Sequence, residues 1–268
     1  EMPVNLSPPA ALETAAIVAR SFLAHKLELR RGPYYDVVDS HHDQAFQGTG
    51  HLSDKAREAV KSTEGVILFW NGRALPAFYH STCGGHTSAV DKVFEADPFE
   101  PLSGVSCGNC ESSPKYRWTT RVSAAQLKAA WEKASHRPLK IKGQIVRWET
   151  EPDELGRAGE FTAETDAGEK LRLNANRVRL ALLNATPKIL PSAWITRLER
   201  QGGEFVLEGR GYGHGVGLCQ WGTITLAQEE KDAEFILKKY YPGARLVRAV
   251  IPGTAPPPKS GILSRMGM

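Results

Sequence analysis

Hydrophobic positions recur at helical spacing near the start of the chain. Apolar residues repeat every three to four positions over Ala11–Leu23, after the pair Pro8-Pro9. Proline is favoured in the first turn of a helix, so this pattern predicts an amphipathic helix that ends before Gly32-Pro33. A second, short helix is predicted over Ser53–Val60, because serine is a good N-cap residue.

Two apolar runs then predict a hairpin. Residues 66–70 and 75–79 flank Asn71-Gly72, a dipeptide that tolerates the positive φ angles of a tight turn. The polar, glycine-bearing segment 80–86 follows the second predicted strand directly. Segments of this kind at the end of a strand often carry functional groups.

The rest of the chain predicts further helices and a strand-rich stretch. Ser123–Gln126 fits a capping box that opens a helix. Short apolar stretches alternate with charged, glycine-bearing turns over 139–174, which predicts several strands. Residues 178–183 and 232–240 predict helices, and 205–207 predict a strand.

These elements together predict an α+β fold. We expect a main lobe, with a mixed β-sheet and packed helices, built from residues 1–116 and 191–250. A smaller β-rich lobe is expected over 117–190. Residues 251–268 are rich in proline, glycine and serine without periodicity, which predicts a mobile tail.

Composition and charge exclude some classes of protein. The 34 Lys and Arg residues exceed the 30 Asp and Glu residues only slightly, for a net charge of +4, which does not favour nucleic acid as a partner. No apolar run is long enough for a membrane helix, and no positively charged start followed by an apolar core marks a signal peptide in these residues. The chain opens on Glu1-Met2-Pro3 as if trimmed at a domain edge, so export and a membrane anchor upstream of residue 1 stay compatible with the sequence.

Glycine occupies every second position over Gly209–Gly217. In an extended strand this spacing would leave one face without side chains, while Arg210, Tyr212 and His214 project together from the other. One interpretation is a strand packed closely against a neighbour. The other is a binding site that lets a bulky ligand approach the backbone.

A sugar polymer is one ligand that fits these residue types. Sugars need flat apolar faces and hydrogen-bonding amides and hydroxyls, which Tyr212, Trp221, Gln220, Ser81 and Thr82 supply. A dinucleotide site is disfavoured, because strict alternation of glycine differs from the spacing of the phosphate-binding motif.

The cysteines suggest either a metal site or a disulfide. The chain contains four, Cys83, Cys107, Cys110 and Cys219. The first three could bind a structural zinc ion, with His80 or His86 as the fourth ligand. In an exported protein, a disulfide from Cys83 to either member of the C-x-x-C pair is the alternative. Cys219 is interpreted as a buried free thiol.

Several segments, in this order along the chain, resemble one family, the stage II sporulation protein D and amidase-enhancer group of bacterial cell-wall proteins. Glu1-Met2-Pro3 is similar to its E-M-P motif. Residues 11–22 resemble its A-L-K-A-Q-A-V-A-A-R-[ST]-[YF] segment and residues 77–85 its A-F-Y-H-S-[TS]-x-G-G segment. Residues 209–222 resemble G-R-G-[WY]-G-H-G-V-G-[ML]-S-Q-W-G, and 240–243 complete the order.

The resemblance implies a lytic transglycosylase that cleaves peptidoglycan glycan strands, preferably strands without stem peptides. Glu1 would be its general acid and base and would give a 1,6-anhydro-muramic acid product. The helix Ala11–Leu23 and the glycine strand are the expected walls around this glutamate. The expected substrate-binding groups are Arg20, His80, Ser81, Thr82, Tyr212, His214, Gln220 and Trp221.

The resemblance also implies a location and partners. We expect a protein exported to the cell envelope, on the periplasmic or extracellular side, with other cell-wall hydrolases among its partners. The alternative function is a non-catalytic, glycan-binding activator of a cell-wall amidase. Some sporulation members carry zinc in a corresponding segment that contains two cysteines and a histidine, but Val38 and Asp43 stand at the cysteine positions in this chain, so that site is expected to be lost. The expected metal set is therefore Cys83, His86, Cys107 and Cys110.

Overall fold

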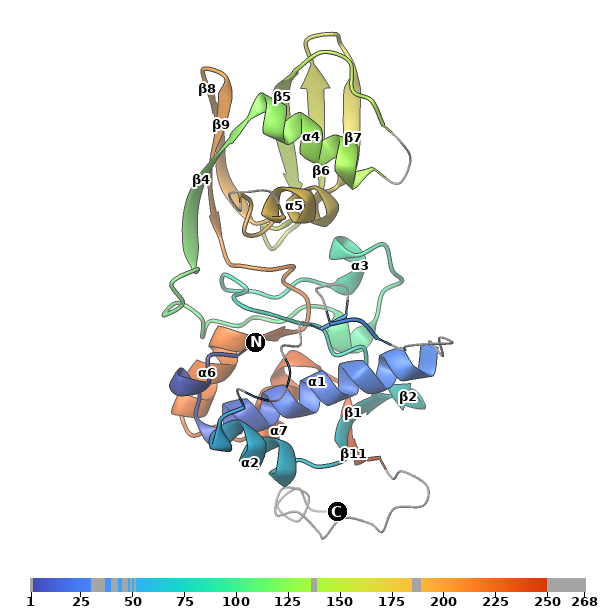
Figure 1. Cartoon of the computed structure of the whole chain (residues 1–268), viewed down its shortest axis with the longest axis vertical. Helices are drawn as coiled ribbons and strands as arrows, with labels where there is room; N and C mark the ends of the chain where they lie inside the picture. The colour runs from blue at the N-terminus through green and yellow to red at the C-terminus, as the bar shows by residue number, and fades with distance from the viewer. Residues whose placement is uncertain are drawn as a thin grey trace. The chain divides into compact units, whose positions relative to one another are not determined.

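A computed structural model of the chain describes residues 2–29, 37–39, 43–44, 48, 50, 52–135, 139–184 and 189–249 (Figure 1). The chain divides into two compact units. Unit 1 comprises Glu1–Tyr79 and Gln220–Met268, and unit 2 comprises His80–Cys219. Among the described residues, none of the helices has the length and apolar character needed to span a bilayer.

Helix α1 (Pro9–Leu29) is the centre of unit 1. It begins at the predicted proline and packs against α2 (Asp54–Ser62), α6 (Gln220–Gln228) and α7 (Ala233–Tyr240). A single 3-10 turn, η1 (Val4–Leu6), precedes it. The predicted cap of α2 is present, because Ser53 Oγ accepts a hydrogen bond from the N–H of Ala56. Helix α7 has a cap as well, since Asp232 accepts a hydrogen bond from the N–H of Phe235.

The sheet of unit 1 has the strand order β11-β1-β2, all antiparallel, with β1 at Val66–Trp70, β2 at Arg73–Ala74 and β11 at Arg245–Arg248. Asn71 and Gly72, with φ angles of 45° and 82°, form the predicted hairpin turn. The returning strand is shorter than predicted. Since Pro76 has no N–H to donate, regular pairing does not continue through the expected second strand.

Unit 2 contains two three-stranded antiparallel sheets. One has the order β4-β9-β8, with β4 at Arg117–Ser123, β8 at Ile195–Gln201 and β9 at Glu204–Arg210. The other has the order β5-β6-β7, with β5 at Ile145–Pro152, β6 at Ala158–Thr165 and β7 at Lys170–Asn174. Short elements complete the unit, namely α3 (Val90–Val93), η2 (Glu100–Leu102) and β10 (Leu218–Cys219). Strand β10 pairs with β3 (Tyr79–His80), at the two points where the chain passes from one unit to the other.

One hydrophobic core joins both sheets of unit 2 to two helices, α4 (Ala124–Ala134) and α5 (Ala175–Leu183). Trp131 of α4 and Phe161 of β6 are completely buried in it, and Trp148 packs edge-on against Phe161. Helix α4 opens with the predicted capping box, in which Ser123 and Gln126 each bond the other's backbone. Burial of such large side chains supplies the main stabilisation of this part of the chain.

The predicted α+β class is confirmed. The predicted smaller lobe, 117–190, lies within unit 2, where it shares its core with β8 and β9. Residues 80–116 and 191–219, assigned above to the main lobe, also cluster with unit 2, because their backbone pairs with other segments of that unit. The lobe boundaries stay a prediction, and the tail 251–268 lies outside the described residues.

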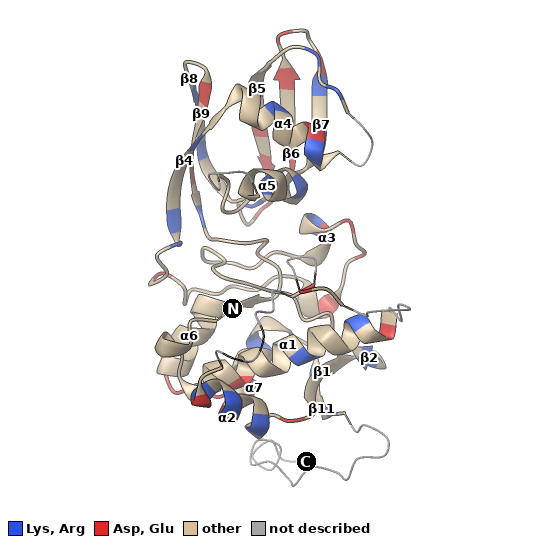
Figure 2. Cartoon of the chain, viewed as in Figure 1, with Lys and Arg blue, Asp and Glu red and all other residues tan. Residues whose placement is uncertain are grey.

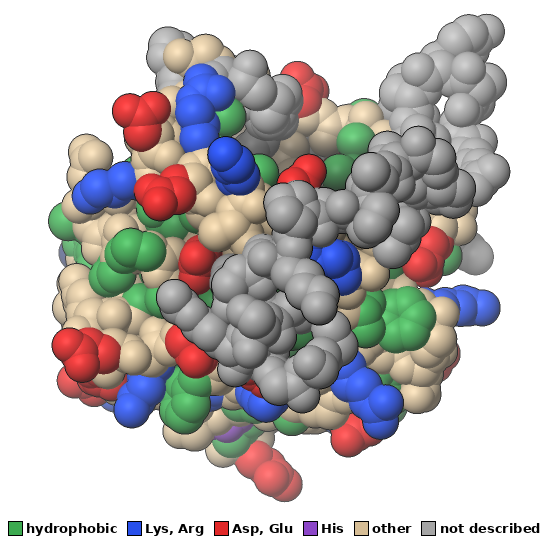
Figure 3. Space-filling model, turned by 90° about the horizontal axis from the view of Figure 1, so that it is seen from below, with side chains coloured by type: hydrophobic (Ala, Val, Ile, Leu, Met, Phe, Trp, Pro, Cys, Tyr) green, Lys and Arg blue, Asp and Glu red, His purple; other side chains and the backbone are tan. Residues whose placement is uncertain are grey.

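Charged side chains of both signs are interspersed over the described surface. Figure 2 shows Lys and Arg next to Asp and Glu along the strands of unit 2, and the face in Figure 3 mixes both signs with hydrophobic side chains. Exposed pairs such as Arg197 with Glu199 lie on these strands. Solvent-exposed ion pairs contribute little to the free energy of unfolding, so the stability of each unit depends on its hydrophobic core.

Candidate functional site

Two of the predicted functional segments meet in unit 2. Thr82 donates its N–H to the carbonyl of Tyr212 at 3.1 Å, and Tyr212 donates its own N–H to the carbonyl of Thr82 at 2.8 Å. Further along, the N–H of Ser88 bonds the carbonyl of Gly215 at 2.8 Å. The polar segment after β3 and the glycine block, 130 residues apart at the first of these pairs (212 − 82), therefore form one continuous piece of structure.

The backbone of the glycine block is not the extended strand that its spacing predicted. Strand β9 ends at Arg210, and each glycine from Gly211 to Gly217 has a positive φ, between 70° and 111°. Only glycine adopts this conformation without strain. The block is also closely packed: a Cβ on Gly211 would lie 2.6 Å from the carbonyl oxygen of Thr82. The close-packing interpretation therefore accounts for these glycines.

A pair of histidines lies where the two segments meet. His80 and His214 are in edge-on contact, with ring centroids 5.4 Å apart, and His214 also contacts the ring of Phe94. His80 is buried, and its Nδ1 lies 3.1 Å from the carbonyl oxygen of Val216. Because a carbonyl only accepts, Nδ1 carries the proton and Nε2 is the free acceptor.

Burial, followed by the nearby Arg157 guanidinium, lowers the pKa of His80 to about 3. A histidine with this pKa is neutral at physiological pH and does not act as a general acid there. Since His80 is only 4% exposed, it contacts the His214 ring and is not placed to contact a bulky ligand.

The other predicted groups of unit 2 differ in their exposure. Thr82 is fully buried, and its hydroxyl forms a 2.7 Å hydrogen bond with that of Ser113. Ser81, Tyr212 and His214 are half-buried, so their polar atoms can reach a ligand. The geometry favours these three as contact residues and gives Thr82 a supporting place.

The remaining predicted site residues belong to unit 1. Glu1 lies outside the described residues. Gln220 and Trp221 open helix α6, where Gln220 is buried and Trp221 half-buried. Arg20, on α1, donates its Nη1 to the carbonyls of Thr63 and Val66, each at 2.8 Å.

These contacts give Arg20 a structural task, since they tie α1 to the end of α2 and to β1. We expect Arg20→Met to lower the free energy of unfolding by about 2–3 kcal/mol, because two carbonyls lose a charged donor. Arg73→Met, at an exposed arginine of the same unit, is the control and should change stability little. Chemical denaturation measures both. If Arg20→Met were as stable as the parent but bound glycan more weakly, Arg20 would be a substrate-binding residue and not a structural one.

All four cysteines of the chain lie together in unit 2. The Sγ atoms of Cys83, Cys107, Cys110 and Cys219 are within 4.8 Å of one another, and all four residues are buried. This corrects two predictions. His86 is not in the group, since its Nδ1 contacts the carbonyl of Thr87, and Cys219 is a member of it instead of an isolated thiol.

Only a weak signal in the sequence pointed to the role of Cys219. It stands where the family motif has serine, and that departure, with three other cysteines present, could have indicated a fourth member. Burial raises the pKa of the Cys219 thiol, and hydrogen bonding with Cys107 and Cys110 raises the pKa of Cys83. At Cys83 and Cys219 the uncharged thiol is therefore favoured, whereas the pKa of Cys110 is lowered, because the raising effect of hydrogen bonding with Cys107 is outweighed by hydrogen bonding with Cys219 and Cys83.

A groove of about 670 Å³ in unit 2 was not anticipated. It is lined by Phe94, the residue that contacts His214, together with the carboxylates of Asp91 and Asp153 and the amide of Asn174. An aromatic face among carboxylates and an amide suits a ligand that is rich in hydroxyl groups. Sequence reasoning missed this groove because its lining comes from separate loops and strands.

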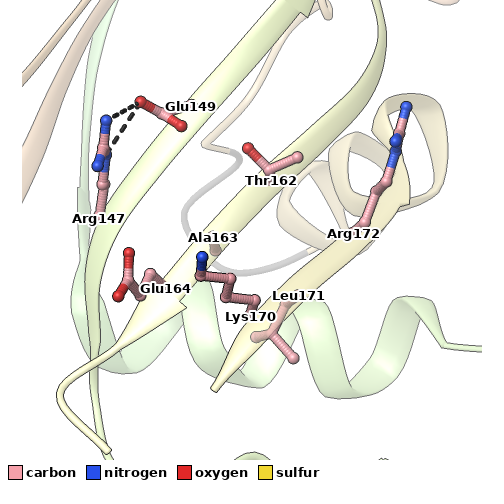
Figure 4. Close-up of a pocket in the computed structure, with 8 residues that line it drawn as sticks. All are labelled: Arg147, Glu149, Thr162, Ala163, Glu164, Lys170, Leu171 and Arg172. Carbon is pink, nitrogen blue, oxygen red and sulfur yellow. Dashed lines mark hydrogen bonds and ion pairs between the residues drawn. The ribbon is translucent and has the colours of Figure 1, made fainter. Parts of the chain in front are cut away.

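A second hollow, of about 330 Å³, lies on the open face of the sheet β5-β6-β7 (Figure 4). Its charged residues occupy alternate positions of the strands and point to one side. Arg147 pairs with Glu149 there, and Arg172 with Glu160. Such pairs are ordinary on a solvent-facing sheet, so we assign no function to this hollow.

The fold and the site define an α+β protein in which a glycine block is packed against a histidine-bearing segment and a cluster of four cysteines. Comparison with known families gives two matches. A family model described as "Stage II sporulation protein" matches residues 1–70, and one described as "Domain of unknown function (DUF8618)" matches residues 102–217.

Three curated proteins are similar over most of the chain. An uncharacterised protein of Brachyspira hyodysenteriae is 28% identical over 244 residues, which cover 90% of this chain and 62% of that protein. Stage II sporulation protein D of Bacillus subtilis is 27% identical, covering 93% of this chain and 71% of that protein. The amidase enhancer of Bacillus subtilis is 25% identical, covering 92% and 39%. The chain is therefore similar to proteins of the stage II sporulation protein D and amidase-enhancer group, as its motifs indicated.

Proposed function

We propose that this chain acts in the bacterial cell wall, at the envelope, as a lytic transglycosylase of peptidoglycan glycan strands. The observation that carries the proposal is the meeting of the two motif segments, joined by reciprocal hydrogen bonds between Thr82 and Tyr212. Two similar proteins of Bacillus subtilis have names that refer to sporulation and to enhancement of an amidase. Both processes remodel the wall, and strands without stem peptides are the preferred substrate that we propose.

The residues of the site fit a sugar polymer. Tyr212 and Phe94 offer aromatic faces, while Ser81 and His214 offer hydrogen-bonding groups that are half-exposed. Close packing of the glycine block against Thr82 and Cys83 holds the Tyr212 side chain in a set position for such a ligand. The groove beside Phe94 adds carboxylates, such as that of Asp91, that can bind sugar hydroxyls.

The two segments contain no carboxylic acid, since residues 80–88 and 209–217 lack Asp and Glu. Glycoside chemistry needs a proton donor near neutral pH, and the neutral His80 cannot supply it. Glu1 is our proposed donor. It would protonate the glycosidic oxygen and then, as a base, take the proton from the 6-hydroxyl as that oxygen closes on the anomeric carbon. The product is a 1,6-anhydro sugar, and no water is consumed.

We expect Glu1→Gln to reduce release of anhydro-muropeptides from purified denuded glycan by about 10²–10⁴-fold, the usual contribution of a general acid. Glu58→Gln, at an exposed carboxylate on α2, is the matched control and should retain full activity. Mass spectrometry of the released fragments measures both. Equal activity of Glu1→Gln and its parent would contradict the catalytic assignment.

A non-catalytic role is the second candidate, and the similarity to an amidase enhancer favours it. In that case the wild-type chain releases no anhydro product. It would instead bind glycan and raise the activity of an amidase added to the same reaction, and Glu1→Gln would leave that stimulation unchanged.

A further inference from the structure

We propose that Cys83, Cys107, Cys110 and Cys219 bind one structural zinc ion through four thiolates. All four ligands belong to unit 2 and are supplied by three separate segments. Cys83 follows β3, Cys107 and Cys110 lie in one loop, and Cys219 ends β10. A site with four protein ligands leaves no position for water or substrate, so its task is structural.

The spacing of the sulfur atoms fits a metal better than a disulfide. Zinc–sulfur bonds of about 2.3 Å place the corners of a tetrahedron about 3.8 Å apart. The Sγ atoms of Cys83 and Cys110 are 3.4 Å apart, and no Sγ pair in the group exceeds 4.8 Å. A disulfide needs about 2.05 Å and joins two sulfurs, whereas here four converge.

Backbone groups around the cluster are placed to stabilise thiolates. The N–H of Cys83 points at Sγ of Cys219 at 3.3 Å, and the N–H of Gly85 points at Sγ of Cys83 at 3.4 Å. The N–H of Cys107 bonds the carbonyl of Gly85 at 3.0 Å, which holds the C-x-x-C loop against the segment after β3. Hydrogen bonds of this kind orient metal ligands and tune their charge.

Two buried arginines supply an independent argument from charge. Arg157 and Arg179 are only 2% and 3% exposed. A guanidinium group stays protonated in proteins, so both are buried cations. Arg157 Nη2 donates to the carbonyl of Cys83 at 2.7 Å, while its Nε and Nη1 have no partner among the described residues.

Buried cations need opposite charge nearby. Arg157 lies close enough to four groups to be attracted by their negative charge when they are ionised: Cys83, Asp153, Cys219 and Cys110. Four thiolates around a divalent ion carry a net charge of −2, which gives the buried Arg157 guanidinium beside Cys83 an opposite charge. Four uncharged thiols, or two disulfides, would leave that charge without this balance.

The site would fix the segments that form the candidate binding surface. Cys83 is the residue after Thr82, and the carbonyl of Ser81 lies 3.7 Å from Sγ of Cys219. Zinc at this point would anchor the polar segment and the end of the glycine block to the C-x-x-C loop. The site does not depend on glycan cleavage, so its test and the test of the proposed function can fail separately.

Elemental analysis of the full chain, purified without chelator after expression with added zinc, tests the proposal. We expect one zinc ion per chain in the parent and in His86→Ala, which removes the histidine first expected as a ligand. Cys219→Ser should lose most of the metal. Removing zinc with a chelator should lower the melting temperature, and adding zinc back should restore it.

Cobalt substitution provides a readout if Cys219→Ser folds poorly. Cobalt in the parent should give the strong sulfur-to-metal absorption of a four-thiolate site, and His86→Ala should give the same spectrum. The proposal is overturned if the parent retains no metal, whether thiol titration then shows disulfides or four free thiols. It is also overturned if the retained metal is iron, or if the cobalt spectrum of His86→Ala differs from that of the parent.

Discussion

Gly211→Ala is expected to destabilise unit 2 by about 3–5 kcal/mol, the sum of backbone strain and overpacking. Gly211 has a φ of 78°, and an added Cβ would lie 2.6 Å from the carbonyl oxygen of Thr82 and 2.9 Å from that of Cys83. The carbonyl of Thr82 accepts from the N–H of Tyr212 and that of Cys83 accepts from Arg157 Nη2, so neither can move without breaking a hydrogen bond. Thermal and chemical unfolding measure the loss.

Gly202→Ala is the matched control for this prediction. Gly202 lies between β8 and β9 with a φ of 62°, and nothing is within 4 Å of the position that a Cβ would take. It should lose only about 1–2 kcal/mol, the cost of the left-handed conformation alone. If the two variants were equally stable, close packing at the glycine block would not be the reason for its glycines.

Acid is expected to destabilise unit 2 through His80. The folded pKa of about 3 lies below the ordinary value of 6.5, because burial and Arg157 disfavour the charged ring. Between these values the unfolded chain binds the proton and the folded chain does not. The contribution of His80 is therefore complete above pH 6.5 and is lost as the pH falls toward 3. By about pH 5 the loss should be about 2 kcal/mol, and the full shift corresponds to about 4–5 kcal/mol.

The comparison of the parent with His80→Asn at two pH values isolates this effect. At about pH 7.5 the variant reports the cost of lost packing, since His80 is neutral there in both states. At about pH 5 the difference between parent and variant should shrink by about 2 kcal/mol, because only the parent carries the titrating group. Any acid-driven loss of a metal from the cysteines occurs in both proteins and cancels. A difference that stays constant between the two pH values would show that His80 is not buried as a neutral ring.

The position of His80 bears on how the two candidate functions are judged. A buried neutral imidazole that contacts His214 can shape a binding surface, but it cannot donate a proton to a leaving group near neutral pH. Catalysis therefore depends on Glu1, whereas binding does not. A glycan-binding protein that had lost its acid would keep the same arrangement around His80, Tyr212 and the glycine block.

Local signals predicted most of the elements correctly. Pro9 begins α1, Ser53 and Asp232 cap α2 and α7, and the Ser123 capping box opens α4. These elements depend on neighbours within one turn, so the residues that define them are adjacent in the sequence. The second strand of the first hairpin was wrong in extent, because Pro76 interrupts pairing and the apolar run continues past it.

The site was predictable as a set of segments. Its motif order identified the family relationship, and the structure brings His80, Ser81 and Thr82 together with Tyr212 and His214. The conformation of the glycine block was not predictable, since alternate glycines are compatible with a cleared strand face and with repeated positive φ angles. Packing against Thr82 and Arg157 selects the second.

The sequence by itself determined the elements, the α+β class and the family relationship, because each depends on short-range patterns or on ordered motifs. Only the tertiary structure decided which residues are neighbours. It buried His80, gathered Cys219 with three cysteines more than a hundred residues away, and placed Arg157 and Arg179 without exposure to water. The physical reason is that burial and long-range contact come from the packing of whole segments, which no local spacing in the chain records.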